Sequence, residues 1–423
     1  MKNNSFTALA ESLFGILLLI GICACSEGAS GDTGTDTIGT TDTSPENTVD
    51  GGDGDTELSY TTPPDSVVCE DNSAQVSFGL SAWGSTRDWS TAVDLEYGAD
   101  LRYLYVYILD GGMDNPDDFR DWYIQLHIDA AESIGAIPFF TFYQLLDIGE
   151  RQGYTGSEME IVQAVLTDAE AMNRYFSNFV WFLQVLSERA PEAIVQSEPD
   201  SWGFMMWAMG AEGNDDPESI SVQVDGSGFA DAAGFANDAT GLGKALLSMR
   251  DKYAPSVRMG WHASNFRVGT RPEVVTEFYS KLGNWDLLVG EAPHNREDDV
   301  DWWLEWDDEL YQRNLDWFYT VTSTTGLPMI LWQIPIGEMD YHLLGDGHYT
   351  TKLEDYAAAG IIAFLFDHSN TTGASDPDDY SGFSTQPPAD TGISGTFADL
   401  RSRLAGYAAE PLPLPEGSIC LEK

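Results

Sequence analysis

Eight short apolar runs, each followed by a loop and a stretch with helical character, constrain the fold of this chain most strongly. Several runs are continuously apolar, which is typical of parallel strands covered by helices. Eight such alternations predict an α/β fold, a (β/α)8 TIM barrel, with a doubly wound open sheet as the alternative. No glycine-rich phosphate loop follows the first run, which disfavours the open sheet. The runs span residues 76–81, 103–109, 137–142, 193–197, 258–261, 287–289, 329–332 and 361–366.

Helices are expected between these strands. The segments with helical character are 119–134, 158–189, 241–253, 273–281, 304–324 and 351–359.

The charge of the chain excludes some partners. Lys and Arg number 20 against 69 Asp and Glu, a net charge of -49. A nucleic-acid binder needs a basic surface, so no nucleic acid is expected as a partner. Aromatic residues make up 12% of the chain, which is too much apolar surface for a chain that is disordered throughout.

The first 25 residues have the composition of an export signal. Lys2 precedes an apolar run over 13–22, which is short for a membrane span and typical of a signal h-region. The run ends in Cys23-Ala24-Cys25, which resembles the lipobox of bacterial lipoproteins. The resemblance implies lipidation at Cys25 and an exported lipoprotein at the outer membrane or cell surface, touching the membrane only through its lipid. An ordinary signal peptide that is cut nearby is the alternative.

Residues 26–66 and 67–423 differ sharply in composition. The first segment is rich in Gly, Thr and Asp with few apolar residues, and it predicts a disordered acidic linker before one catalytic domain. Two cysteines remain for the domain, Cys69 near its start and Cys420 near its end. Since domain termini often lie close together and exported proteins meet oxidising conditions, we expect a Cys69–Cys420 disulfide, with two free thiols as the alternative. The domain is expected to be a monomer.

The residues that follow the predicted strands favour carbohydrate chemistry. A barrel builds its active site at the carboxyl ends of its strands. Here those ends carry carboxylates, amides and aromatic rings, which suit a site that stacks on sugar rings and binds their hydroxyls. The expected substrate-binding residues are Trp83, Asp110, Tyr143, Gln144, Trp202, His262, Asn265, His294, Trp332, Gln333 and Asp367.

Hydrolysis of a glycosidic bond uses two carboxyl groups, and the fourth strand offers the most specific candidates. Glu198-Pro199-Asp200-Ser201 follows it directly and resembles the E-P-D-S segment of glycoside hydrolase family 6, in which the Asp lies in the active centre. Many retaining barrel glycosidases instead place their acid/base Glu at the end of this strand, which favours Glu198. A structural role, in which the pair caps a helix or binds backbone, is the alternative.

The second carboxylate is expected on the sixth strand. The largest clan of retaining barrel glycosidases has a Glu nucleophile after the seventh strand, but here Gln333 occupies that position and Glu338 lies beyond it. Glu291 follows the sixth run directly. We therefore expect Glu198 as general acid/base, Glu291 as its partner and Asp200 as a group that modulates or replaces one of them. Because Gln333 cannot be a nucleophile, a non-catalytic glycan-binding lipoprotein is the alternative function.

The W-Q-x-P-x-G segment around Gln333 also resembles one in secreted barrel proteins that are classed as probable glycoside hydrolases. The resemblance supports the class of the protein only.

Neither a cofactor nor a catalytic metal is expected. His262, His294 and His368 each follow a strand, yet no H-E-x-x-H spacing occurs. Oxygen ligands at Asp376, Asp378 and Asp379 could hold Ca²⁺, but the preferred interpretation is a solvated acidic loop. No G-x-S-x-G elbow is present, which disfavours an esterase.

Overall fold

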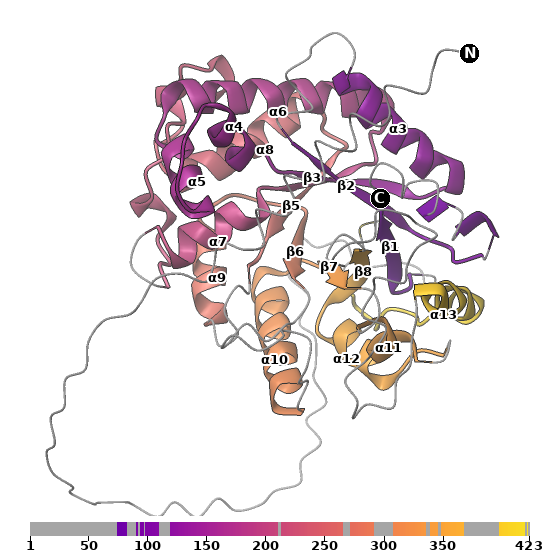
Figure 1. Cartoon of the computed structure of the whole chain (residues 1–423). Coiled ribbons are helices and arrows are strands. Elements are labelled where there is room, and N and C mark those ends of the chain that lie inside the picture. Colours follow the sequence, from indigo (N-terminus) through magenta and orange to yellow (C-terminus); the bar gives the residue numbers. More distant parts are fainter. Residues whose placement is uncertain are drawn as a thin grey trace, which may run out of the picture. The chain divides into compact units, whose positions relative to one another are not determined.

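The predicted barrel is confirmed. The computed structural model describes residues 74–82, 90–91, 94–96, 98–109, 119–209, 213–264, 271–291, 308–335, 339–345, 348–367, 397–418 and 421. Eight strands form a closed barrel in chain order, and β1 pairs with β8 to close it. All neighbouring pairs are parallel, from β1–β2 around to β7–β8 (Figure 1). The open-sheet alternative is therefore excluded.

The strands lie close to their predicted positions. Most observed bounds differ from the prediction by one or two residues. The main difference is at the seventh strand, which continues past Trp332 and so includes Gln333. The strands are β1 (Ser77–Ser81), β2 (Tyr103–Ile108), β3 (Ile137–Phe142), β4 (Ile194–Ser197), β5 (Arg258–His262), β6 (Leu287–Glu291), β7 (Met329–Pro335) and β8 (Ile361–Asp367).

The helices connect the strands as a barrel requires. They are α3 (Phe119–Ile134), α4 (Leu145–Arg151), α5 (Glu158–Leu166), α6 (Ala169–Arg189), α7 (Pro199–Trp207), α8 (Ala239–Tyr253), α9 (Pro272–Ser280), α10 (Asp308–Thr325), α11 (Met339–Leu344), α12 (Thr351–Ala358) and α13 (Phe397–Ala409), with short 3-10 helices η2 (Pro217–Ser219), η3 (Asp225–Ser227) and η4 (Ala230–Ala232).

The helix predicted over 158–189 is two helices. The Asp168 side chain accepts a hydrogen bond from the backbone N–H of Ala171 at 2.8 Å, so Asp168 is the N-cap that begins α6. Ser157 caps α5 in the same way and forms a capping box with Glu160. A continuous apolar pattern hid this break, because both helices bury the same kind of face.

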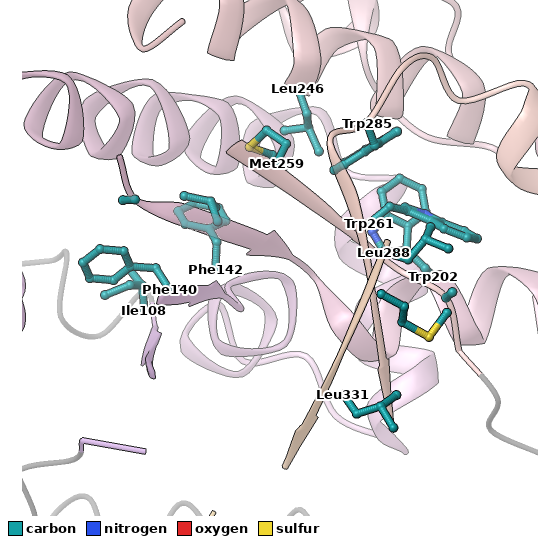
Figure 2. Packing of buried hydrophobic residues seen from close by; sticks show 14 of the residues in the cluster. Ile108, Phe140, Phe142, Trp202, Leu246, Met259, Trp261, Trp285, Leu288 and Leu331 are labelled. Atoms are coloured by element: carbon teal, nitrogen blue, oxygen red, sulfur yellow. The ribbon is translucent and has the colours of Figure 1, made fainter. Parts of the chain in front are cut away.

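Two apolar layers hold the barrel together. The inner layer fills the barrel and comprises Tyr103, Tyr105, Ile137, Phe139, Ile194, Leu287, Val289, Ile330, Trp332, Ile362, Ala363 and Leu365. The outer layer lies between strands and helices, and Figure 2 shows Trp202, Trp261 and Trp285 gathered in it. The Trp202 ring lies edge-on to Trp261 at 6.3 Å and to Trp285 at 6.0 Å between centroids.

Gly79 keeps part of the inner layer tight. A Cβ atom at this position of β1 would lie 2.5 Å from a Leu365 methyl group and 2.7 Å from the Tyr103 carbonyl oxygen. Only glycine fits where the backbone approaches its neighbours this closely.

The two ends of the described domain meet beside β1. The backbone N–H of Val76 donates to Leu412 at 3.0 Å, and that of Leu414 donates to Ala74 at 2.9 Å. The Tyr407 hydroxyl donates to the Val76 carbonyl at 2.7 Å. Residues 1–66, with Cys25, lie outside the described residues, as do Cys69, Cys420 and the acidic loop with Asp376, Asp378 and Asp379. Among the described helices, none is both long and apolar enough to cross a membrane.

Candidate active site at the barrel mouth

Tyr107 is the centre of the candidate site. It lies on β2, one inward-facing step beyond Tyr105. Burial raises its pKa well above the ordinary value, and the negative charges of neighbouring carboxylates raise it further. These neighbours come from four different parts of the barrel: Asp367, Asp200, Glu291 and Glu158. The fold thus gathers acidic groups from distant parts of the sequence around one phenol.

Tyr143 extends this centre toward β3. Its ring lies edge-on to Tyr107 with centroids 6.1 Å apart. Its hydroxyl donates a short hydrogen bond to the Glu158 carboxylate at the start of α5. Burial, then the charges of Asp200 and Glu158, raise the pKa of Tyr143 well above its ordinary value. Both phenols therefore stay protonated at neutral pH and can donate hydrogen bonds.

The floor of the mouth is aromatic. The Trp332 ring lies 5.4 Å from Tyr107, 5.9 Å from His262 and 6.2 Å from Tyr105, measured between centroids. Next to it, Gln333 has a left-handed backbone with φ of 51° and donates a short hydrogen bond from its amide to the Tyr107 hydroxyl. A bulge in the β7–β8 register allows Gln333 to turn inward. Gln333 therefore has a strained backbone and is hydrogen-bonded to Tyr107, the centre of the candidate site.

Glu198 lies beside this group, since its charge also raises the pKa of Tyr143, but its carboxylate is held by the backbone at the start of α4. Its carboxylate accepts a hydrogen bond from the backbone N–H of Gln144 at 2.9 Å and makes longer contacts of 3.4 Å with the N–H of Leu145 and the Ser201 hydroxyl. It is only 1% exposed. Burial raises its pKa to about 8, while the backbone hydrogen bonds act in the opposite direction. Glu198 therefore occupies the position that caps the first turn of α4.

A left-handed backbone at Glu198 explains its direction. Its φ of 44° and ψ of 64° turn the chain between β4 and α7, and Pro199 begins α7 directly afterwards. The same turn lets Asp200, in the first turn of α7, approach the phenols of Tyr107 and Tyr143. Of the E-P-D-S segment, Asp200 faces the candidate site and Glu198 faces the helices.

Glu291 ends β6 inside the barrel. It is 7% exposed, and one of its oxygens, Oε1, lies 3.7 Å from Nε2 of His262. Nδ1 of His262 lies 2.9 Å from the amide nitrogen of Gln196, whose amide oxygen accepts from the Thr141 hydroxyl at 3.1 Å. Thr141, Gln196 and His262 are fully buried. A buried polar chain therefore crosses β3, β4 and β5 and reaches the Glu291 carboxylate on β6.

Asp367 ends β8 and is also fully buried. Burial raises the pKa of Tyr105, and the neighbouring Asp367 carboxylate raises it further. The Asp367 charge also raises the pKa of Tyr107, so the carboxylate lies close to both phenols.

Five expected substrate contacts are buried: His262, Trp332 and Asp367 inside the barrel, and Trp202 and Gln144 on its helix side, where the structure differs most from the sequence analysis. Trp202 is fully buried in the outer apolar layer, and its indole N–H donates to the Ser197 carbonyl at 3.0 Å. The side chain of Gln144 is fully buried too and accepts from Asn178 at 2.8 Å. Both residues follow strands, but their side chains turn toward the helices rather than the mouth. Trp83, Asp110, Asn265, His294, Glu338 and His368 lie outside the described residues.

Tyr107, Glu158, Gln196 and Thr141 are site residues that the sequence analysis missed. Tyr103, Tyr105 and Tyr107 alternate along β2, and this period of two could have identified Tyr107 as inward-facing. Glu158 gave no signal, because a Glu in the first turn of a helix is common. Among the described residues, no group of three or more His, Cys, Asp or Glu has the geometry of a metal site.

Comparison with known proteins finds distant similarity to solved structures. No family model matches the sequence, and no curated protein matches it. A Bacteroidetes-affiliated cellulase of glycoside hydrolase family 5 is similar with a TM-score of 0.46 and 10% identity, over 80% of this chain and 92% of that chain. A beta-galactosidase from the psychrophilic Marinomonas ef1 gives 0.46 and 9%, over 79% of this chain and 59% of that chain. D-psicose 3-epimerase from Clostridium cellulolyticum H10 gives 0.40 and 9%, over 79% and 96%.

Proposed function

We propose that this protein is a glycoside hydrolase that cleaves a polysaccharide or an oligosaccharide at the mouth of its barrel. The observation that carries the proposal is the convergence of Asp200, Glu291, Asp367 and Glu158 on Tyr107. Glycoside hydrolysis needs two carboxyl groups on either side of one bond, held by a rigid scaffold. Here strand ends and the first turns of helices hold the carboxyl groups.

Glu291 and Asp200 are the pair that we propose for the chemistry. Each approaches Tyr107, and they come from β6 and from the start of α7. One would protonate the leaving oxygen while the other acts as base or nucleophile. In this proposal Asp200 takes the role that the sequence favoured for Glu198, because both Glu198 oxygens already contact donors of the protein.

The aromatic floor supports a sugar as the ligand. The rings of Tyr107 and Tyr143 are partly exposed at the mouth, and the buried Trp332 ring packs against Tyr107. Apolar faces of a sugar ring stack on such surfaces, while the phenol and amide groups bind its hydroxyls. The low content of Lys and Arg agrees with a neutral glycan, since an anionic one would be repelled by the carboxylates.

The location of the protein remains a proposal that rests on the sequence. The lipobox-like segment at Cys25 and the acidic linker support an exported lipoprotein held at a distance from a lipid surface. The pairing of residues 74–76 with 412–414 supports a disulfide between Cys69 and Cys420, because both cysteines lie a short way beyond the paired segments.

The test is hydrolysis of a glycan panel by the full chain, with release of reducing sugar as the readout. We expect at least one glycan to be cleaved, and Glu291→Gln and Asp200→Asn to abolish cleavage while the melting temperature is kept. NMR of the first-formed anomer would identify retention or inversion. Full activity in both variants would contradict the assignment of the pair.

One observation favours a second function, glycan binding without hydrolysis. Gln333 takes the position at which many retaining barrel enzymes carry their nucleophile, and its amide is bonded to Tyr107. A binding protein would show a higher melting temperature with a glycan and release no sugar from any member of the panel.

A further inference from the structure

A buried chain of polar groups runs from Thr141 through Gln196 and His262 toward Glu291 of the proposed catalytic pair. Thr141, Gln196 and His262 are each fully buried inside the barrel. Buried polar side chains are costly unless they are hydrogen-bonded, and such networks fix the geometry of their members. A network of this kind next to a working carboxylate can control how that carboxylate is held.

The carboxylate end sets the direction of the hydrogen bonds. A carboxylate can only accept, so a proton on Nε2 of His262 is the arrangement in which the ring donates toward Glu291, whose Oε1 lies 3.7 Å away. Nδ1 then has a lone pair and must accept, which requires the Gln196 amide to present its N–H at the observed 2.9 Å. The Gln196 oxygen consequently faces the Thr141 hydroxyl, which donates to it at 3.1 Å.

We propose that Gln196 is a positioning residue that fixes His262 as the tautomer with its proton on Nε2, and that His262 in this form orients the Glu291 carboxylate. This proposal deepens the proposed function and rests on it for the role of Glu291. The 3.7 Å separation of His262 Nε2 and Glu291 Oε1 is longer than a hydrogen bond, and such contacts commonly tighten when substrate binds. The ring is held from the other side by Trp332, whose edge-on contact limits its rotation.

The tautomer can be measured without any substrate. The full chain labelled with ¹⁵N-histidine has six His residues, and a His262→Gln variant identifies the signals of His262. Two-bond ¹⁵N–¹H correlation spectra distinguish a protonated Nε2 from a protonated Nδ1. We expect the Nε2 form in the wild-type protein. A proton on Nδ1, or a doubly protonated ring at neutral pH, would overturn the proposal.

Gln196→Glu is the sharpest variant, because it preserves the shape and removes the N–H. A glutamate can only accept, so His262 must then protonate Nδ1, and we expect the Nδ1 signal to move to the protonated type. Thr141→Val removes only the outer end of the chain and should leave the tautomer in place. Unchanged His262 signals in Gln196→Glu would contradict the proposal, and the wild-type spectrum decides the matter if that variant does not fold.

Two controls distinguish an effect that passes through the Thr141–Gln196–His262 chain from a general effect of adding a carboxylate. Gln163→Glu makes the same substitution at an exposed position of α5 and should not move the His262 signals. His127 is equally buried, and its Nε2 lies 3.0 Å from the Leu104 carbonyl oxygen, so it must carry the proton there. Its signals should stay unchanged in Gln196→Glu.

Kinetics on any glycan that the wild-type protein cleaves give the second readout. Gln196→Glu should lower kcat by up to about 100-fold with KM nearly unchanged, because a misplaced catalytic group slows the reaction without loosening the substrate. An unchanged kcat would overturn the positioning role. If no glycan is cleaved, the proposed function fails, while the NMR result on the tautomer still stands by itself.

Discussion

Glu198 and Glu291 have the same local sequence setting and opposite surroundings. Each directly follows a buried apolar strand, β4 or β6. Glu198 turns outward, where backbone N–H groups of Gln144 and Leu145 surround its carboxylate. Glu291 stays inside the barrel, where it faces His262 and the phenol of Tyr107. The comparison teaches that position after a strand does not decide which way a carboxylate faces.

The cause of the difference is one backbone conformation. Glu198 has a positive φ, which is rare for a residue with a side chain, and this φ redirects its carboxylate toward α4. Glu291 is still part of its strand and follows the inward direction of Leu287 and Val289. The strained backbone of Glu198 between β4 and α7 thus orients α7, and through it Asp200.

The largest expected effect is on catalysis by Glu291→Gln. If Glu291 is one of the working carboxylates, loss of its charge should lower kcat/KM by about 10²–10⁴-fold. Initial rates on a cleaved glycan give the measurement. Glu198→Gln is the matched control, since it makes the same change at a carboxylate that backbone N–H groups of α4 already hold, and it should keep kcat/KM within about tenfold of the wild-type value. The opposite order of effects would reverse the roles of the two residues.

Trp202→Ala should act on stability alone. Removal of a fully buried indole from the cluster with Trp261 and Trp285 leaves a cavity and should lower the free energy of unfolding by about 3–5 kcal/mol. Urea denaturation followed by circular dichroism measures this loss. The affinity for a bound glycan should be unchanged below the melting temperature. A large loss of glycan affinity in a folded variant would show that Trp202 contacts the ligand.

Glu198→Gln should change how stability depends on pH. Below about pH 4.5 the carboxyl is protonated in both the folded and the unfolded chain. As the pH rises toward 8 the unfolded carboxyl ionises first, so the buried group lowers the free energy of unfolding progressively, with no further loss above the folded pKa of about 8. The free energy of unfolding falls by about 1.4 kcal/mol for each unit by which the folded pKa exceeds the unfolded pKa.

The measurement is the difference in unfolding free energy between Glu198→Gln and the wild-type protein at several pH values. Between about pH 4.5 and pH 8, the free energy of unfolding of the variant should increase relative to that of the wild-type protein. Subtraction removes the contributions of the many other acidic residues. Glu291→Gln serves as the comparison across the same pH values, and a flat difference for Glu198→Gln would show that its carboxyl is not held at a raised pKa.

Tyr107→Phe should give the smallest effect. It removes the hydroxyl that accepts from Gln333 and lies among the carboxylates, while the ring against Trp332 remains. One hydrogen bond of this kind is worth about 1 kcal/mol, so KM should rise about fivefold with the fold unaffected. Isothermal titration with a glycan that the protein binds gives the same comparison without turnover, and an unchanged affinity would remove the hydroxyl from the site.

The sequence by itself determined the barrel. Apolar runs such as 137–142 and 361–366 form buried strands wherever helices cover them, so their local composition is sufficient to find them. It also determined that acidic groups follow several of the strands. The break at Asp168 escaped the pattern, because a cap depends on one side chain and one backbone N–H.

Only the tertiary structure decided which of these groups meet. The φ of Glu198 and the bulge before Gln333 depend on neighbouring strands, and no local pattern records them. Tyr107 is the centre of the candidate site because carboxylates on β6, β8, α5 and α7 lie near its phenol. They come together only when the barrel closes. Side-chain direction at a strand end is set by a few backbone angles that packing selects, and this is the physical reason why the site could be predicted only in part.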